Sequence, residues 1–236
     1  MAAIDQMLDT LEAMEFSPAE INIFLNLKLR QRAAARDELK IAVVECNPET
    51  LSQLLEQLEE AAGPADFHAH LLRDVQKYPY RIGEDVDLIV TSAEHADVLK
   101  DIISRRDKLA KVALRLTAQS VAGLLKLHPG QRLGILCRSQ RFGELIRSVC
   151  ADCTENVDVR PPRLLDEEPE LDAFLAELSA LAVPDGFERY ASHRVLQRIR
   201  AFGESHPLVR CRYQVDEGSL MYLSDRIEQL RSRARV

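Results

Sequence analysis

Long apolar runs are missing from this sequence: no window comes near the roughly 18 consecutive apolar residues that suggest a membrane-spanning helix. The N-terminal stretch MAAIDQMLDTLEAMEF carries acidic residues and no basic residue, whereas a secretory signal begins with positive charge and continues into a longer apolar segment. The 5 cysteines are odd in number and scattered, which argues against a disulfide framework. We therefore expect a cytoplasmic protein with no membrane partner.

Positive charge and glycine-rich motifs are also scarce. The chain has 31 Lys and Arg against 38 Asp and Glu, a formal net charge of −7, whereas nucleic-acid modules usually carry a basic face. Neither phosphate-loop pattern, GxGxxG or GxxxxGK[ST], occurs, and there is no GxSxG motif of the serine hydrolases. We expect no direct DNA binding, no cofactor, no metal ion and no catalytic residue.

The composition is that of an ordinary globular protein. Apolar residues make up 46% of the chain and charged residues 29%, so disorder is not expected. A chain of 236 residues is long enough for one sizeable core or for two lobes of about 100 residues each.

Residues 1–39 are expected to form a helical lead-in. An apolar stripe recurs at three- and four-residue steps through the first helix, at Ile4, Met7, Leu8, Leu11 and Met14. A second helix begins at Ser17, with Pro18 in its first turn and Glu20 completing a capping box. Two such helices do not make an independent core, so we expect them to pack on a partner subunit or an upstream domain. The stripe on the first helix suggests a homodimer.

Strands and helices alternate from Lys40 onward, which indicates a mostly parallel sheet. The first lobe, residues 40–128, has expected strands at 40–46, 67–72, 86–92 and 111–117, with helices at 48–62, 94–103 and up to 127. His128-Pro129-Gly130 then interrupts the pattern. The second lobe, residues 129–236, has expected strands at 132–139, 157–162, 180–184 and 208–215, with helices at 142–151, 168–178, 192–202 and 216–231. The prediction is an α/β fold with two βα lobes around a cleft.

Polar residues gather where these strands end, and ligands of open α/β sheets bind beyond the carboxyl ends of the strands. We expect a ligand-binding set of Glu45, Asn47, Thr91, Ser92, His95, Arg115 and Ser139. A carboxylate at the end of a buried strand, such as Glu45, needs a partner. Other readings stay open: the Asn and Ser residues could be helix caps, His95 a structural histidine and Arg115 a member of a buried ion pair.

A two-cysteine enzyme is the alternative interpretation. Cys46 and Cys137 lie at the ends of the opening strands of the two lobes. In cofactor-independent aspartate/glutamate racemases, two thiols face each other across a cleft, and VVECNPET at 43–50 loosely resembles the first cysteine motif of that family. The second motif departs from it, because Cys137 is followed by Arg138-Ser139 where the family has a Cys-Thr-His-like run.

Four segments together resemble the C-terminal effector domain of GntR-type bacterial transcriptional regulators: VVECNPETLSQLLEQLEE, DLIVTSAEHADVL, RLGILCRSQRF and YQVDEGSLMYLSDRIEQL. The resemblance lies in an ECN after the first strand, a TT-x-x-H-like segment after the third, and a D-x-[GA]-S segment that opens the last helix. It covers most of residues 3–232. It implies a periplasmic-binding-protein-like effector pocket that holds a small anionic metabolite. DNA binding would belong to a winged helix-turn-helix head, which these residues do not supply.

Overall fold

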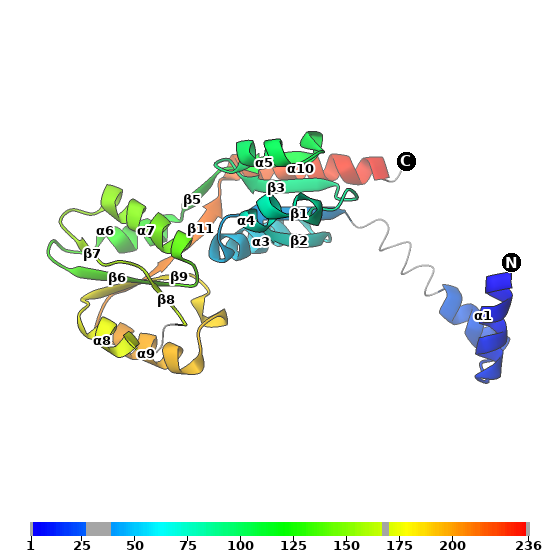
Figure 1. The fold of residues 1–236 in the computed structure, drawn as a ribbon, viewed down its shortest axis with the longest axis horizontal. Coiled ribbons are helices and arrows are strands. Elements are labelled where there is room, and N and C mark those ends of the chain that lie inside the picture. Colours follow the sequence, from blue (N-terminus) through cyan, green and yellow to red (C-terminus); the bar gives the residue numbers. More distant parts are fainter. Residues whose placement is uncertain (1, 27–38, 167–169, 235–236) are drawn as a thin grey trace.

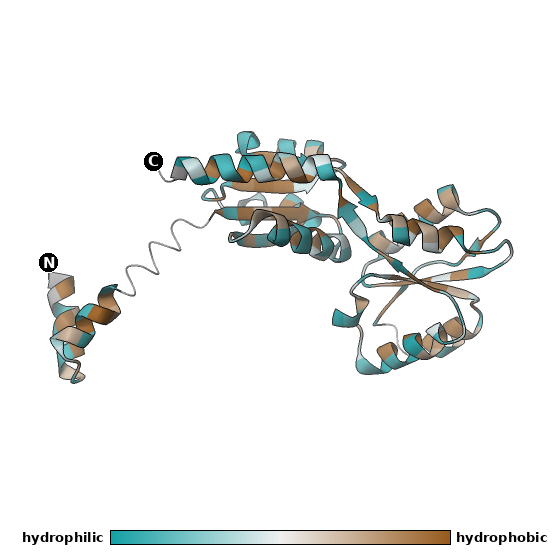
Figure 2. Cartoon of the chain, turned by 180° about the vertical axis from the view of Figure 1, so that it is seen from behind, coloured by the Kyte–Doolittle hydropathy of each residue, from teal (hydrophilic) through white to brown (hydrophobic). Residues whose placement is uncertain are grey.

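A computed structural model describes residues 2–26, 39–166 and 170–234 (Figure 1). The chain is an α/β protein with mostly parallel sheets. Figure 2 shows the strands of the two larger sheets mainly in brown, between helices that carry teal on their outer sides. Within the described part of the chain, none of the helices is both long and apolar enough to cross a membrane.

Two helices form the N-terminal segment, α1 (Ala2–Ala13) and a second helix at residues 18–26. The predicted capping box is confirmed: Glu20 Oε2 accepts hydrogen bonds from the amide and the hydroxyl of Ser17, at 2.9 and 2.7 Å. Apolar side chains on both helices stay exposed, which leaves their packing on a partner a prediction; they include Ile4, Met7, Ile23 and Phe24. The charged end of the predicted lead-in, residues 27–38, lies outside the described residues.

The first unit is a four-stranded parallel sheet with helices on both faces. Its strands follow the order β2 (Asp66–Leu71), β1 (Lys40–Glu45), β3 (Leu88–Ser92) and β4 (Leu109–Val112). One face packs against α3 (Pro48–Ala62) and α10 (Glu217–Ala234), and the other against α4 (Leu72–Lys77) and α5 (Ala96–Ile102). The short 3-10 helices η1 (Pro79–Arg81) and η2 (Arg106–Lys108) precede β3 and β4. Burial on both faces explains the continuous apolar run of β1.

The second unit repeats this layering. Its strands follow the order β10 (Leu208–Cys211), β9 (Ala180–Pro184), β6 (Arg132–Cys137) and β7 (Asp158–Val159), and β8 (Arg163–Leu164) also pairs with β6. One face packs against α6 (Ala118–Leu125) and α7 (Gln140–Cys153), and the other against α8 (Leu171–Ala176) and α9 (His193–Gly203). The 3-10 helix η4 (Phe187–Arg189) follows β9.

Two short strands connect the units, β5 (Leu114–Leu116) and β11 (Tyr213–Val215), which pair antiparallel (Figure 1). The sequence predicted single strands at 111–117 and 208–215, and this is wrong in detail. Each breaks in two, because the chain leaves one sheet after β4 or β10 and continues as a connecting strand. The apolar residues run on through the break, so their pattern does not reveal the change of partner.

The units exchange helices across the boundary that the sequence suggested between residues 128 and 129. Leu116, Leu124 and Leu127 lie in the core of the second unit. Leu223 and Ile227 of the closing helix α10 lie in the core of the first unit. The chain therefore enters the second unit through β5 and returns to the first through β11, which differs from the ranges 40–128 and 129–236.

Candidate functional site

A cavity of about 260 Å³, called here the site cavity, lies at the carboxyl ends of β1 and β3. Its polar lining residues include Glu45, Cys46, Asn47, Thr50, Ser92 and His95 of the first unit. Leu114 of β5, Tyr213 of β11 and Leu145 of α7 contribute further walls. The site cavity therefore touches the first unit, both connecting strands and the second unit.

Four of the seven predicted binding residues line this cavity, namely Glu45, Asn47, Ser92 and His95. They meet because β1 and β3 are parallel neighbours, with Val44 paired to Thr91 in the register. The polar residues that follow the two strands therefore lie at one edge of the sheet, where ligands of such sheets bind.

Three predicted residues lie outside the cavity lining. Thr91 is fully buried, and its Oγ1 donates to the Val44 carbonyl at 2.8 Å, which ties β3 to β1. Arg115 is exposed on β5, opposite Gln214 of β11. The reading of Arg115 as a member of a buried ion pair assumed that the strand predicted at 111–117 stays within the sheet. Ser139 caps α7, with its hydroxyl accepting from Phe142 N at 3.3 Å.

Glu45 is 2% exposed, and its carboxylate is fully engaged. Its Oε1 accepts from the Ser92 amide at 2.9 Å. Its Oε2 accepts from the Cys46 amide at 3.3 Å and lies 3.4 Å from His95 Nε2. A buried carboxylate needs such partners to offset the loss of hydration. The predicted need for a partner is therefore met by His95 and two backbone amides.

His95 and Cys46 shift each other's protonation. Hydrogen bonds to Cys46 and Glu45 raise the pKa of His95 to about 10 against the opposing effect of burial. Burial alone would raise the pKa of Cys46, but hydrogen bonds from His95 and Asn47 outweigh it and the pKa of the thiol is lowered. Asn47 Nδ2 lies 3.5 Å from Cys46 Sγ. Near neutral pH the imidazole of His95 is therefore charged, and it stabilises the thiolate form of Cys46 relative to the thiol.

Two buried hydroxyls in the cavity lining have no hydrogen-bond partner among the described residues. They are Thr50 Oγ1 and Ser92 Oγ, on residues that are 4% and 5% exposed. A buried polar group left unpaired costs about 1–3 kcal/mol, and few such groups occur in native structures. The cavity thus presents two buried hydroxyl groups that no described residue pairs.

Sequence reasoning missed Thr50, Leu145 and Tyr213, and it considered Cys46 for the racemase alternative alone. Burial, with smaller contributions from nearby Cys211 and Glu94, raises the pKa of Tyr213 to about 12. The phenol therefore stays neutral and able to donate a hydrogen bond. Because Leu145 and Tyr213 come from the second unit and its connecting strand, no local pattern around residues 45–50 could have identified them.

The N-terminus of α7 is occupied by a carboxylate of the chain itself. Glu49, 1% exposed on α3, accepts hydrogen bonds through Oε1 from the amides of Arg138 and Ser139, both at 2.7 Å. Its Oε2 accepts from the Ser139 hydroxyl at 2.6 Å. Helix N-termini favour anions, so the anion expected beside Ser139 is supplied by Glu49. The three bonds join the first unit to the second.

Helix α3 also bonds to the connecting strand β11. Gln53 Oε1 accepts from the Tyr213 amide at 2.8 Å, and Gln57 Oε1, one turn further along, accepts from the Val215 amide at 2.9 Å. Gln57 Nε2 donates back to the Tyr213 carbonyl at 3.1 Å. Two side-chain amides thus take the place of a neighbouring strand along β11.

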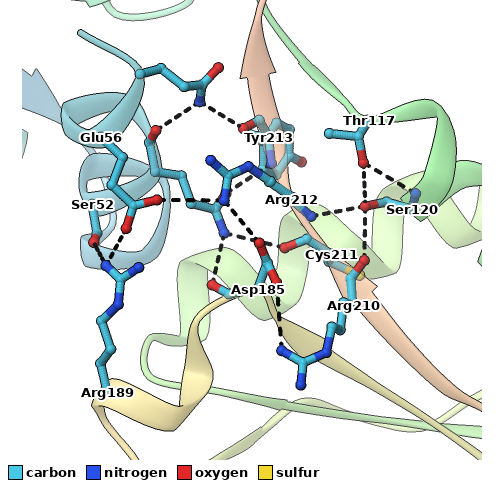
Figure 3. A network of polar contacts seen from close by, with 12 residues as sticks. Ser52, Glu56, Thr117, Ser120, Asp185, Arg189, Arg210, Cys211, Arg212 and Tyr213 are labelled. Atoms are coloured by element: carbon cyan, nitrogen blue, oxygen red, sulfur yellow. Dashed lines mark hydrogen bonds and ion pairs between the residues drawn. The ribbon is translucent and has the colours of Figure 1, made fainter. Parts of the chain in front are cut away.

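Charged residues continue this junction (Figure 3). Arg212 Nη1 lies 2.9 Å from Asp185 Oδ2 and 3.5 Å from Glu56 Oε2. Glu56 of α3 also pairs with Arg189 of the second unit. Arg210 Nη1 lies 3.6 Å from Asp185 Oδ1. The junction is therefore polar, as is common where two units of one chain meet.

Cys137, the second thiol of the racemase alternative, is fully buried and does not line the site cavity. It lies at the end of β6, where its Sγ donates to the Arg163 carbonyl at 3.6 Å. A racemase of this kind needs both thiols at one cavity, so the geometry offers this alternative no support.

Comparison with known proteins gives a family match and a structural likeness. Residues 134–234 match a family model described as the YmtS Rossmann-like domain, which spans β6 to α10. A solved structure of an NtrC family transcriptional regulator from Clostridium acetobutylicum aligns with 83% of this chain and 97% of its own, at 14% identity and a TM-score of 0.33, too low to carry an argument. No curated protein matches. The chain is thus an α/β protein whose C-terminal part is similar to a YmtS Rossmann-like domain.

Proposed function

We propose that this chain is the ligand-sensing effector domain of a GntR-type transcriptional regulator and that it binds a small anionic metabolite in the site cavity. The observation that carries the proposal is the pair of unpartnered hydroxyls of Thr50 and Ser92, buried in one cavity. Protein interiors rarely leave such groups unpaired, and a ligand with oxygen or nitrogen atoms would complete both.

The cavity supports a small ligand of this class. Its volume of about 260 Å³ falls below the roughly 300–1,000 Å³ of drug-sized sites. His95 carries positive charge near neutral pH because its pKa is raised to about 10. A carboxylate or similar anion would accept hydrogen bonds from the hydroxyls of Thr50 and Ser92 and from the Tyr213 phenol, while the positive charge of His95 attracts it.

Coupling to a regulator follows from where the walls of the cavity lie. Leu114 and Tyr213 are on the two connecting strands, and Leu145 is on α7 of the second unit. A ligand that touches all of these favours the arrangement of units in which the contacts form, since a ligand shifts an equilibrium by its differential affinity for two states. In this proposal the units close on the ligand in the manner of periplasmic binding proteins.

The regulator part of the proposal rests on the sequence resemblance to GntR-type effector domains. It assigns DNA binding to a winged helix-turn-helix head outside these residues and dimerisation to the N-terminal helices. The net charge of −7 agrees with a domain that does not itself hold DNA.

A thermal-shift and calorimetric screen tests the proposal with small carboxylic acids and their uncharged amides. A ligand at 100 times its Kd adds about 2.7 kcal/mol of stability. Thr50→Val removes one hydroxyl at nearly constant shape, so we expect affinity to fall roughly 2- to 10-fold, the equivalent of about 0.5–1.5 kcal/mol. Without ligand, the same variant is expected to be as stable as the wild type or more stable, because the lost hydroxyl was unpaired.

Ser148→Ala is the matched control, because Ser148 is an exposed hydroxyl on α7 and its loss should leave ligand affinity unchanged. A screen in which no acid or amide stabilises the chain would contradict the proposal. So would a ligand whose affinity is equal in the wild type and in Thr50→Val. Stronger binding of the amides than of the acids would overturn the anionic class and leave the cavity assignment in place.

A further inference from the structure

Three side chains of different chemistry converge at the floor of the site cavity. The carboxylate of Glu45, the thiol of Cys46 and a ring nitrogen of His95 lie within 4.8 Å of one another. Glu45 Oε2 and His95 Nε2 are 3.4 Å apart. Glu45 ends β1, Cys46 follows it, and His95 precedes α5, so the group is held on the rigid edge of the first sheet.

These separations are close to those of a tetrahedral metal site. Zinc binds His nitrogen and carboxylate oxygen at about 2.0–2.2 Å and thiolate sulfur at about 2.3 Å. Ligand atoms around such an ion are therefore about 3.3–3.8 Å apart. The observed 3.4 Å between Glu45 Oε2 and His95 Nε2 already meets this requirement. The ligand atom of Cys46 lies within 4.8 Å of those of Glu45 and His95, and its sulfur would move toward them to bind the same ion.

The charges also balance at this position. A thiolate and a carboxylate carry two negative charges, which a divalent ion neutralises while His95 binds as the neutral imidazole. The ion would replace the protons of the Cys46 thiol and the His95 imidazolium, and metal binding at such ligands releases protons in this way. Sulfur and nitrogen ligands favour zinc and its transition-metal neighbours over magnesium or calcium.

Groups around the three ligands hold them in place. The Ser92 amide donates to Glu45 Oε1 at 2.9 Å, which leaves Oε2 directed to the cluster. Asn47 Nδ2 lies 3.5 Å from the Cys46 sulfur. Such outer partners orient metal ligands and tune the metal.

An independent observation indicates that the cluster faces a bound species. The unpaired Ser92 Oγ and Thr50 Oγ1 line the same cavity. Zinc sites with three protein ligands keep a fourth position for water or another exchangeable group. A water or ligand atom in that fourth position would lie on the cavity side of the cluster. The two unpaired hydroxyls line the same cavity.

We propose that Glu45, Cys46 and His95 bind a divalent transition-metal ion of the zinc type, with a fourth position open to the site cavity. This departs from the expectation of no metal drawn from the sequence. The inference rests on the geometry of the three ligand atoms and not on the identity of any metabolite.

The test uses the full chain, stripped with a chelator and then titrated with Co²⁺ and Zn²⁺ alone. Co²⁺ should bind one to one and give a sulfur-to-cobalt charge-transfer band. Zn²⁺ should displace it and protect Cys46 from iodoacetamide. Loss of an outer partner of a metal ligand costs about 10- to 100-fold in affinity, so Asn47→Ala should weaken binding within that range and Cys46→Ser by more.

Cys153→Ser is the matched control, because Cys153 is a half-buried thiol at the end of α7, and this variant should keep the band and the affinity. His68→Ala removes an exposed histidine of β2 and should change neither the band nor the affinity. Circular dichroism confirms that each variant is folded. The proposal is overturned if Zn²⁺ does not protect Cys46 in the wild type, or if Cys46→Ser binds Co²⁺ with unchanged affinity and spectrum. Because no metabolite is present, a negative result leaves the ligand-sensing proposal standing.

Discussion

At the scale of single residues, the cavity depends on a thiol whose neighbours favour its charged form. Cys46 is partly buried, which by itself opposes the thiolate. The hydrogen bonds from His95 and Asn47 outweigh that effect and lower the pKa of Cys46. Cys150 has no such partners, and burial raises its pKa to about 11. Reactivity toward electrophiles therefore belongs to Cys46 rather than to Cys150.

We predict that metal-free Cys46 is alkylated by iodoacetamide at lower pH than an ordinary thiol, whose pKa is about 8.5. The sign follows from the lowered pKa: the thiolate stays populated as pH falls through the range in which a free thiol is protonated. His95→Gln removes both the hydrogen bond and the positive charge, so burial then dominates and the midpoint moves to higher pH. Mass spectrometry of the modified peptide gives the rate at each pH.

Asn47→Ala should move the same midpoint upward by less, because it removes one of the favourable hydrogen bonds and no charge. Cys150 supplies an internal reference in every sample, since it should stay unmodified below about pH 9. Equal midpoints for the wild type and His95→Gln would show that His95 does not control the thiol.

Residues at the ends of buried strands were the most predictable part of the site. Glu45 follows four buried residues of β1, and a carboxylate there had to find a partner. The rule about strand ends also identified Ser92 and His95. Thr91 does not line the cavity, because successive strand residues face opposite sides and its hydroxyl bonds to the neighbouring strand. The place of Tyr213 in the cavity lining was not predictable, because its distance from residues 45–50 depends on how the two units meet.

At the scale of elements, α3 is the helix that joins the two units. Its first turn places Glu49 on the N-terminus of α7, and its later turns bond through Gln53 and Gln57 to β11. The sequence predicted the bounds 48–62 correctly. It did not reveal that the polar face was also engaged, because Glu and Gln on a helix are usually solvated.

We predict that Glu49→Gln destabilises the chain by about 2 kcal/mol, because hydrogen bonds to a charged group contribute about 1.5–3 kcal/mol. The side-chain amide of the substituted Gln keeps one acceptor oxygen. Its NH₂ group is a donor and would face another donor at the N-terminus of α7. Urea unfolding measures the loss, and hydrogen exchange should become faster at the amides of Arg138 and Ser139. Glu59→Gln is the control, because Glu59 is exposed on the same helix; an effect of equal size there would contradict the assignment.

The strands could be predicted as apolar runs, but the neighbours with which they pair could not. Residues 111–117 and 208–215 each read as one strand, and each divides into a sheet strand and a connecting strand. The pattern of apolar side chains continues through both breaks. This pattern alone therefore cannot show where a strand changes its pairing partner. For this reason Arg115 is exposed on β5 and does not line the site cavity.

At the scale of the whole molecule, the two units are built from exchanged pieces of chain. Helix α6 completes the second unit although it precedes β6, and α10 completes the first although it ends the chain. Alternation of strands and helices predicted two sheets in sequence order. It could not assign α10, since an amphipathic stripe fits either sheet. The antiparallel pair of β5 and β11 is the result of these two crossings.

This arrangement predicts that a core substitution near the C-terminus weakens the N-terminal sheet. Leu223 of α10 is 1% exposed and belongs to the core of the first unit, where α10 packs against α3 and β4. Leu223→Ala should cost about 2–5 kcal/mol, as large-to-small core substitutions do. Hydrogen exchange should rise first in β1 to β4 and less in β6, β9 and β10. Met221→Ala, at a position 70% exposed on the same helix, should leave exchange unchanged. If Leu223→Ala instead loosened the second sheet first, α10 would belong to the second unit in solution, and the junction at β5 and β11 would have to be redrawn.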